Sequence, residues 1–121
     1  MPQSTEHSLS ELARRAYRAY ETKDRRAIEA LLAEDFTFTS PYDDHIDRKT
    51  YFERCWPNSE NTRAFTFERL FEQGNEVFVH YTLELKTGAV FRNVELLRFE
   101  GNKIVEVDVY FGRTLKEAPE K

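Results

Sequence analysis

The sequence predicts an α+β domain in which three N-terminal helices cover one side of a curved antiparallel or mixed sheet. Apolar residues recur with helical spacing in the first third of the chain, whereas the second half alternates with the period of a strand. Three of the four glycines lie at breaks between the strand-like runs. The 121 residues suffice for one core, so we expect a single domain over residues 1–121, with its core at about 8–112 and loosely attached ends.

Two helices are expected first. Ser8 and Glu11 fit the S-x-x-E capping box, in which each side chain bonds a free backbone amide of the first turn. Asp24 can cap a second, shorter helix. Each helix has one apolar face for packing. The residues of these faces are Leu9, Leu12, Ala13, Ala16, Tyr17, Tyr20, Ala27, Ile28, Leu31 and Leu32.

A short strand and a third helix follow. Phe36 and Phe38 alternate with threonines, and the period of two places Ser40 on the phenylalanine side. Asp47 can cap the third helix, which we expect to end at Pro57. The apolar residues of this helix are Phe52, Cys55 and Trp56.

Four long strands complete the predicted fold. The runs 62–73, 76–86, 89–100 and 103–111 are rich in Val, Phe, Tyr and Thr. Gly-Asn and Thr-Gly pairs separate them, and Gly-Asn is a hairpin signal. The sequence therefore predicts an antiparallel meander.

Composition excludes several classes of function. The net charge of −4 and the pI of about 5.4 argue against nucleic acid or an anionic membrane as a partner. No apolar run approaches the roughly 20 residues that span a bilayer. The single cysteine, Cys55, suits a reducing compartment, and the first residues lack the pattern of a signal peptide. We therefore expect a cytoplasmic protein.

One strand carries polar residues on a face that is otherwise apolar. Phe91, Asn93, Glu95, Leu97 and Phe99 share one face of the run 89–100. If that face is inner, a carboxyl group lies in an apolar wall, where burial raises its pKa and suits it to general acid or base catalysis. Two structural alternatives remain open, namely that the opposite face is inner or that Glu95 pairs with an arginine.

The segment from Asp43 to Asp47 concentrates acids around a histidine. D-D-H-x-D matches no recognised metal-ligand spacing, so we expect a solvated loop in which Asp47 caps the next helix, and no metal site or cofactor. The alternatives are that His45 or Asp44 enters a pocket as a proton carrier, or that the cluster binds metal. Cys55 is best explained as a small buried residue.

The outer face of the sheet is expected to form a homodimer. His80 lies with Phe78 on the outward side of its strand, beside Tyr110 and Ile104 of the last strand. Apolar and aromatic residues on a face that water would otherwise cover favour an interface.

Two stretches carry a family resemblance. YRAYETKDRRAIEALLAEDFTFTSP and LLRFEGNKIVEVDVYFG resemble the opening and the final hairpin of the ketosteroid isomerase-like, SnoaL-like group of the nuclear transport factor two-like superfamily. The resemblance covers about residues 8–112. It implies a cone-shaped barrel, a pocket closed by the helices and a dimer through the convex sheet face.

The family's catalytic positions transfer only in part. The resemblance places the oxyanion-stabilising carboxyl on Glu95, the general base on Ser40 and the tyrosine donor on Ala16, beside Tyr17. Serine cannot act as a carboxylate base, so steroid isomerisation by the same residues is not expected. Limonene epoxide hydrolase-like relatives add an inward arginine, which this chain does not show.

We therefore expect a pocket for a small hydrophobic organic molecule, with cofactor-independent isomerase, cyclase or hydrolase activity as one hypothesis. The expected catalytic residues are Glu95, Asn93, Tyr17 and Ser40. The expected substrate-binding residues are Tyr20, Phe36, Phe38, Cys55, Trp56, Tyr81, Leu83, Leu97, Val107 and Phe111. The alternatives are a non-catalytic ligand-binding or dimerisation module, and a protein-binding module with an exposed groove.

Overall fold

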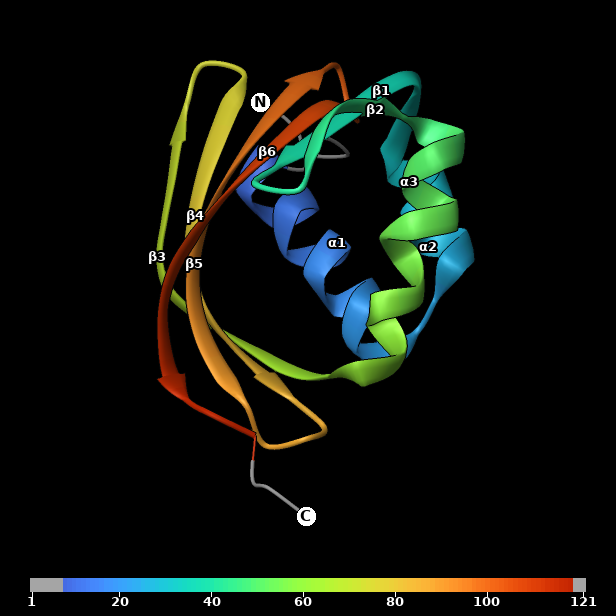
Figure 1. The fold of residues 1–121 in the computed structure, drawn as a ribbon. Coiled ribbons are helices and arrows are strands. Elements are labelled where there is room, and N and C mark those ends of the chain that lie inside the picture. The colour runs from blue at the N-terminus through green and yellow to red at the C-terminus, as the bar shows by residue number, and fades with distance from the viewer. Residues whose placement is uncertain (1–7, 119–121) are drawn as a thin grey trace.

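The computed structural model describes residues 8–118, and in them three α-helices and a 3-10 helix lie against a six-stranded mixed sheet (Figure 1). The sheet is curved but not closed, and the helices occupy its concave side. The elements are α1 (Leu9–Thr22), α2 (Arg25–Leu31), β1 (Leu32–Ser40), β2 (Asp43–Asp47), α3 (Arg48–Arg54), η1 (Trp56–Asn61), β3 (Thr62–Gln73), β4 (Glu76–Leu85), β5 (Val90–Glu100) and β6 (Lys103–Lys116). The predicted α+β class is confirmed.

The predicted helix starts are confirmed by their caps. The Ser8 side chain accepts from the Glu11 amide at 3.1 Å, and Asp24 accepts from the Ala27 amide at 3.2 Å. Asp47 accepts from the Thr50 amide at 2.9 Å, which starts α3. Each cap satisfies an amide that has no partner inside its helix.

The predicted end of the third helix is wrong. α3 ends at Arg54, Cys55 is its C-cap, and a separate 3-10 helix begins at Trp56. Proline disfavours helical backbone at the residue before it but fits the first turn of a new helix. Pro57 therefore lies in the first turn of η1 and does not end α3.

The strands follow the order β2-β1-β6-β5-β4-β3, and only the β1–β6 pair is parallel. The meander of β3 to β6 was predicted, whereas β2 was not. It is a short edge strand that pairs with β1, with Ile46 opposite Phe38. Its sequence has four polar residues in five, so the alternation that reveals a half-buried strand is missing.

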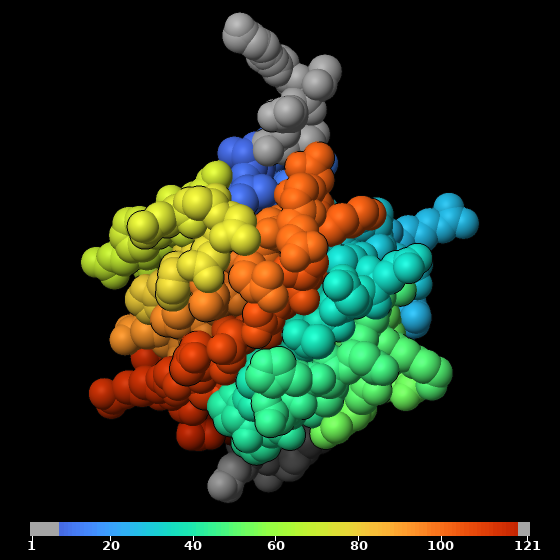
Figure 2. Space-filling model, turned by 90° about the horizontal axis from the view of Figure 1, so that it is seen from above, coloured from blue at the N-terminus to red at the C-terminus, as the bar shows by residue number. Residues whose placement is uncertain are grey.

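The last strand is longer than predicted. Thr114 pairs with Phe91 and Lys116 with Val90, so residues 113–116 belong to the sheet and are not loosely attached. The same expectation for the first seven residues lies outside the described part. In Figure 2 the start of α1 (blue) lies between the turn joining β3 to β4 (yellow) and the turn joining β5 to β6 (orange). Among residues 8–118, no helix has the length and apolar character needed to cross a membrane.

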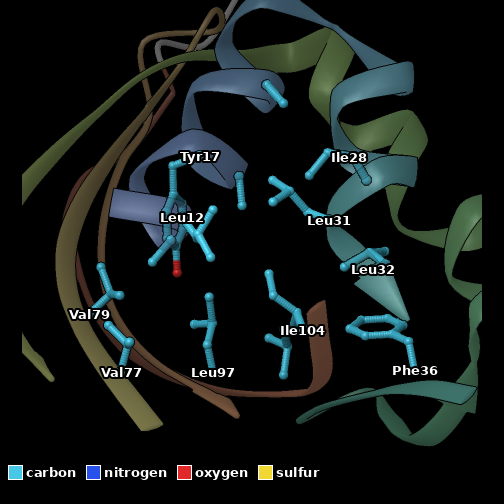
Figure 3. Packing of buried hydrophobic residues seen from close by; sticks show 14 of the residues in the cluster. Leu12, Tyr17, Ile28, Leu31, Leu32, Phe36, Val77, Val79, Leu97 and Ile104 are labelled. Carbon is cyan, nitrogen blue, oxygen red and sulfur yellow. The ribbon is translucent and has the colours of Figure 1, made fainter. Parts of the chain in front are cut away.

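The core lies between the concave face of the sheet and the helices (Figure 3). Val77 and Val79 of β4 are fully buried, and they point toward Leu12 and Tyr17 of α1, as the predicted inner parity of this strand requires. Leu97 extends the same inner wall on β5.

The expected outward position of Ile104 is wrong. A register shift between Arg98 and Phe99 brings Ile104 opposite Phe99, and both Ile104 and Val105 are buried. An irregular pairing of this kind breaks the strict alternation of faces on which the parity argument depends.

Candidate functional site

A cavity of about 250 Å³ lies between the inner face of the sheet and the helices. Two carboxyl groups line it, those of Asp43 and Glu95, and the lining formed by residues 8–118 includes no Lys, Arg or His. The aromatic part of the wall consists of Tyr17, Tyr20, Phe36, Phe38, Tyr42, Tyr51, Phe65, Tyr81 and Phe111. A mainly apolar wall with a few polar groups is typical of small-molecule sites.

Glu95 is held by two phenols. The Tyr17 hydroxyl donates to Glu95 Oε1 at 2.8 Å, and the Tyr81 hydroxyl donates to Oε2 at 2.6 Å. Protein surrounds the carboxyl group, and the part of Glu95 that remains accessible borders the cavity. Glu95 therefore faces inward, and its hydrogen bonds come from neutral donors instead of an arginine.

Three elements bring these groups together. Tyr17 lies on the inner face of α1 and points down toward the sheet (Figure 3). On the sheet, Tyr81 of β4 pairs with Asn93 of β5, while the neighbouring inward residue of β5 is Glu95. Side chains two residues apart on a strand share a face, so all three sheet residues reach the same space.

Asn93 connects this group to the end of the sheet. Its Nδ2 donates to the Tyr81 hydroxyl at 3.3 Å, and its Oδ1 accepts from the Gly112 amide of β6 at 3.2 Å. The Asn93 side chain thus helps to hold the Tyr81 hydroxyl in place, and the backbone of Gly112 fixes the orientation of the Asn93 side chain.

The protein environment raises the pKa values of Glu95, Tyr17 and Tyr81. Burial raises the pKa of Glu95, while the hydrogen bonds from Tyr81 and Tyr17 lower it in part. The pKa values of Tyr17 and Tyr81 lie well above their usual range, because both phenols are buried and face the Glu95 carboxyl. The phenols therefore remain protonated donors, and Glu95 is the group that can exchange a proton.

A second polar cluster surrounds Asp43. Ser40 Oγ donates to Asp43 Oδ2 at 3.2 Å, and the Cys55 sulfur lies 4.0 Å from the same oxygen. Arg54 Nη2 lies 2.8 Å from Oδ1, at an angle that makes an ion pair without an aligned hydrogen bond. Burial, and to a smaller extent the charge of the nearby Asp43, raises the pKa of Cys55 to about 11. The thiol is therefore a poor nucleophile.

Sequence reasoning missed Asp43 and Tyr51. Asp43 was grouped with the solvated loop, yet its side chain is only 9% exposed. Tyr51 of α3 is buried, packs its ring 5.2 Å from those of Phe36 and Phe38, and shares a hydrogen bond with the Tyr20 hydroxyl. Its place four residues before Cys55 was the available signal, because residues four apart lie on the same face of a helix.

The remainder of the acidic segment points away from the cavity. The side chains of Asp44 and His45 are 90% and 62% exposed, and His45 Nδ1 lies 2.7 Å from Asp44 Oδ1. This hydrogen bond raises the pKa of His45. Within the described chain, no group of three or more acidic, histidine or cysteine side chains is arranged to hold a metal ion.

Most of the residues expected at the site border the cavity. These are Tyr17, Tyr20, Phe36, Phe38, Ser40, Cys55, Tyr81, Leu83, Asn93, Glu95, Leu97, Val107 and Phe111. Trp56 is not among the lining residues, and its ring packs behind the wall, 4.8 Å from that of Tyr20. Phe111 lies at the edge, 51% exposed, with its ring 5.5 Å from that of Tyr42.

The tyrosine donor occupies a different helical position from the one that the family resemblance implied. Ala16, to which the resemblance assigned it, borders the cavity without a donor, and the next residue, Tyr17, supplies the hydroxyl.

Several solved structures share this fold. An NTF2-like protein of unknown function from Cytophaga hutchinsonii is 24% identical, with a TM-score of 0.72 over 91% of this chain and 95% of that one. An LEH-like epoxide hydrolase of M. tuberculosis is 15% identical, with a TM-score of 0.72 over 86% and 82%. A Catenulispora acidiphila protein with a ketosteroid isomerase-like fold, in complex with trimethylamine, is 18% identical, with a TM-score of 0.67 over 84% and 85%.

No curated protein sequence matches the chain. The SnoaL-like domain family, in contrast, matches residues 13–107. This match runs from the middle of α1 into β6 and includes Tyr17, Tyr81, Asn93 and Glu95. The chain belongs to the SnoaL-like domain family.

Proposed function

We propose that the cavity binds a small hydrophobic organic molecule and that Glu95 transfers a proton to or from it, in a cofactor-independent isomerisation, cyclisation or hydrolysis. The observation that carries this proposal is a carboxyl group of raised pKa that borders a cavity and is held by two phenols. General acids and bases near neutral pH need a carboxyl group whose pKa is raised in this way.

The neighbouring groups have complementary roles in this proposal. The hydroxyls of Tyr17 and Tyr81 each donate their single proton to Glu95, so they orient the carboxylate and stabilise its charged form. Asn93 holds Tyr81 in place, so it is a positioning residue. The Ser40 hydroxyl donates to Asp43, so Ser40 belongs to the second polar cluster and is assigned no role in proton transfer by Glu95.

Proton transfer is tested with 5-nitrobenzisoxazole, a small molecule of two fused rings that suits a cavity of about 250 Å³. A base removes its ring C–H proton, the electron pair forms a nitrile, the N–O bond breaks, and the phenolate product absorbs visible light. We expect the protein to accelerate this reaction over buffer, with a rate that rises with pH as Glu95 loses its proton. Glu95→Gln should remove the acceleration.

The Tyr17→Phe variant sharpens this experiment. The phenol stabilises the ionised carboxylate, so its loss should raise the pKa of Glu95 and move the pH–rate midpoint upward. Tyr110→Phe is the matched control, because that phenol is exposed and bonds Asp108 on the outer face. Equal rates for the wild type and Glu95→Gln would exclude Glu95 as the base.

A non-catalytic binding module is the second candidate. Both oxygens of Glu95 already accept a hydrogen bond, and a serine stands at position 40, where the family resemblance implied a carboxylate base. These features favour a rigid pocket that binds without reacting. Absence of any acceleration of 5-nitrobenzisoxazole by the wild type would support this candidate over proton transfer.

We also propose that the protein acts as a homodimer in the cytoplasm. The outer face of the sheet exposes Phe71, Phe78 and Tyr110, which is the kind of aromatic surface that interfaces use. The free thiol of Cys55 suits a reducing compartment.

A further inference from the structure

We propose that the cavity selects a small organic cation, namely a tertiary or quaternary ammonium group on an apolar body, over neutral or anionic molecules of the same shape. This inference rests on the proposed binding of a small molecule in the cavity and adds its charge class. It follows from what the cavity wall contains, and from the counter-charge that Glu95 lacks.

Among residues 8–118, no Lys, Arg or His side chain accompanies Glu95. Its hydrogen bonds come from the neutral phenols of Tyr17 and Tyr81, and in the described range it forms no ion pair with Lys, Arg or His. A buried carboxylate is stable only when it is paired or well solvated by donors. An ammonium group in the adjacent cavity would supply the missing positive charge.

The remainder of the wall also favours positive charge. Asp43 supplies the other carboxyl group in the lining formed by residues 8–118, and its partner Arg54 is not part of that lining. An anionic ligand would approach two carboxyl groups, with no basic side chain of residues 8–118 in the wall to attract it. Like charges brought together in a desolvated site repel strongly.

Aromatic side chains make the apolar part of the wall suitable for a cation. Nine aromatic residues border the cavity, and Tyr17, Phe65 and Tyr81 form one cluster with ring centroids 5.0 to 5.4 Å apart. The ring quadrupole attracts a cation within about 6 Å, and aromatic walls recognise quaternary ammonium groups. A quaternary ammonium group has no N–H to donate. It therefore suits Glu95, whose two oxygens already accept hydrogen bonds from phenols.

The size of the cavity suits a compact ligand. Its volume of about 250 Å³ exceeds the roughly 150 Å³ that accommodates benzene in an apolar protein cavity. A trimethylammonium group with a short chain therefore fits, which allows a comparison of probes that differ in charge and share one shape.

The test uses choline, 3,3-dimethylbutan-1-ol and 3,3-dimethylbutanoate, which present a cation, a neutral isostere and an anion on nearly the same skeleton. Affinities are measured from the chemical shifts of the isotope-labelled full chain, which also show whether cavity residues respond. We expect choline to bind about tenfold more tightly than the alcohol. The butanoate should bind most weakly.

Two further measurements identify Glu95 as the source of the preference. Glu95→Gln should reduce the advantage of choline over the alcohol to about twofold or less. Glu84→Gln is the control, because it removes a surface carboxylate of β4 and should leave the preference intact. If Glu95→Gln did not fold, the pH dependence of wild-type binding would give the same information.

In the wild type, the affinity for choline should rise with pH as Glu95 ionises, while that for the alcohol stays constant. The ionisable groups that face Glu95 are Tyr17 and Tyr20 of α1, Tyr51 of α3 and Tyr81 of β4. All four phenols have pKa values raised above their usual range, so they do not titrate between pH 5 and 8.

The outcomes separate this inference from the proposed function. If the alcohol binds at least as tightly as choline, the cation preference is wrong, although the cavity still binds small molecules. Failure of all three probes to perturb cavity residues, in a protein that accelerates 5-nitrobenzisoxazole, also overturns the inference and leaves proton transfer intact. Failure of both experiments overturns both proposals.

Discussion

Glu95 combines a buried position with purely neutral hydrogen-bond donors. An arginine partner would lower the pKa of a carboxyl group, whereas the phenols of Tyr17 and Tyr81 offset only part of the effect of burial. The protein thus keeps a carboxyl group that holds its proton to higher pH than a solvated glutamate. This property links the acid–base chemistry that we propose to the stability of the fold.

The raised pKa predicts that stability falls as pH rises. The folded state binds the Glu95 proton more tightly than the unfolded chain, whose glutamate pKa is about 4.3. Stability should therefore decrease between that value and the raised pKa of the folded state. Urea unfolding of the wild type and Glu95→Gln across this range checks it, and only the wild type should show this contribution. An identical pH dependence in both proteins would contradict the raised pKa.

Strand β6 approaches β5 closely where it borders the site. At Gly112 an added Cβ would lie 2.1 Å from the Arg92 carbonyl oxygen, and the Gly112 amide donates to Asn93. The pairing of β5 with β6 shifts register between Phe91 and Asn93 in this region. Glycine here lets the two backbones approach closely, which holds the Asn93 amide within hydrogen-bond distance of the Tyr81 hydroxyl.

Substitution of Gly112 by Ala should separate these strands. Overpacking of this kind costs about 1–3 kcal/mol, and the displaced amide would release Asn93. We expect a lower free energy of unfolding by urea, together with slower reaction of 5-nitrobenzisoxazole. Arg113→Ala, at an exposed position of the same strand, is the control. Wild-type stability of Gly112→Ala would show that the strands can move apart without loss.

At the scale of the whole molecule, the two faces of the curved sheet differ in character. Its concave face holds the core and the cavity, while its convex face leaves aromatic side chains exposed, among them Phe78 at 44% and Tyr110 at 59%. Because successive residues of a strand alternate between the faces, β4 can contribute Tyr81 to the site and Phe78 to the outer surface.

Disruption of the proposed dimer should leave the site intact. We expect sedimentation of the wild type to give a dimer and that of Phe78→Glu a monomer, because a charge in an apolar interface loses its hydration. The helical and strand content of the variant, measured by circular dichroism, should be unchanged. Thr82→Glu, further along the same face of β4, tests whether charge alone has this effect. A monomeric wild type would exclude the dimer.

Much of the fold follows from local sequence. The caps at Ser8, Asp24 and Asp47 and the glycines between strands depend on hydrogen bonds and backbone angles within a few residues. The inward direction of Glu95 followed from the period of two along one strand, together with the family resemblance. These features need no knowledge of distant contacts.

The tertiary structure alone decided which side chains of the cavity contact one another. Tyr17 and Glu95 are 78 residues apart in the chain, and their hydrogen bond depends on how α1 crosses the sheet. Asp43 reaches the wall because β2 pairs with the edge of β1, and Ile104 turns inward because the β5–β6 pairing shifts register. Local periodicity gives the face on which a side chain lies, but pairing and packing between distant segments determine what that side chain meets.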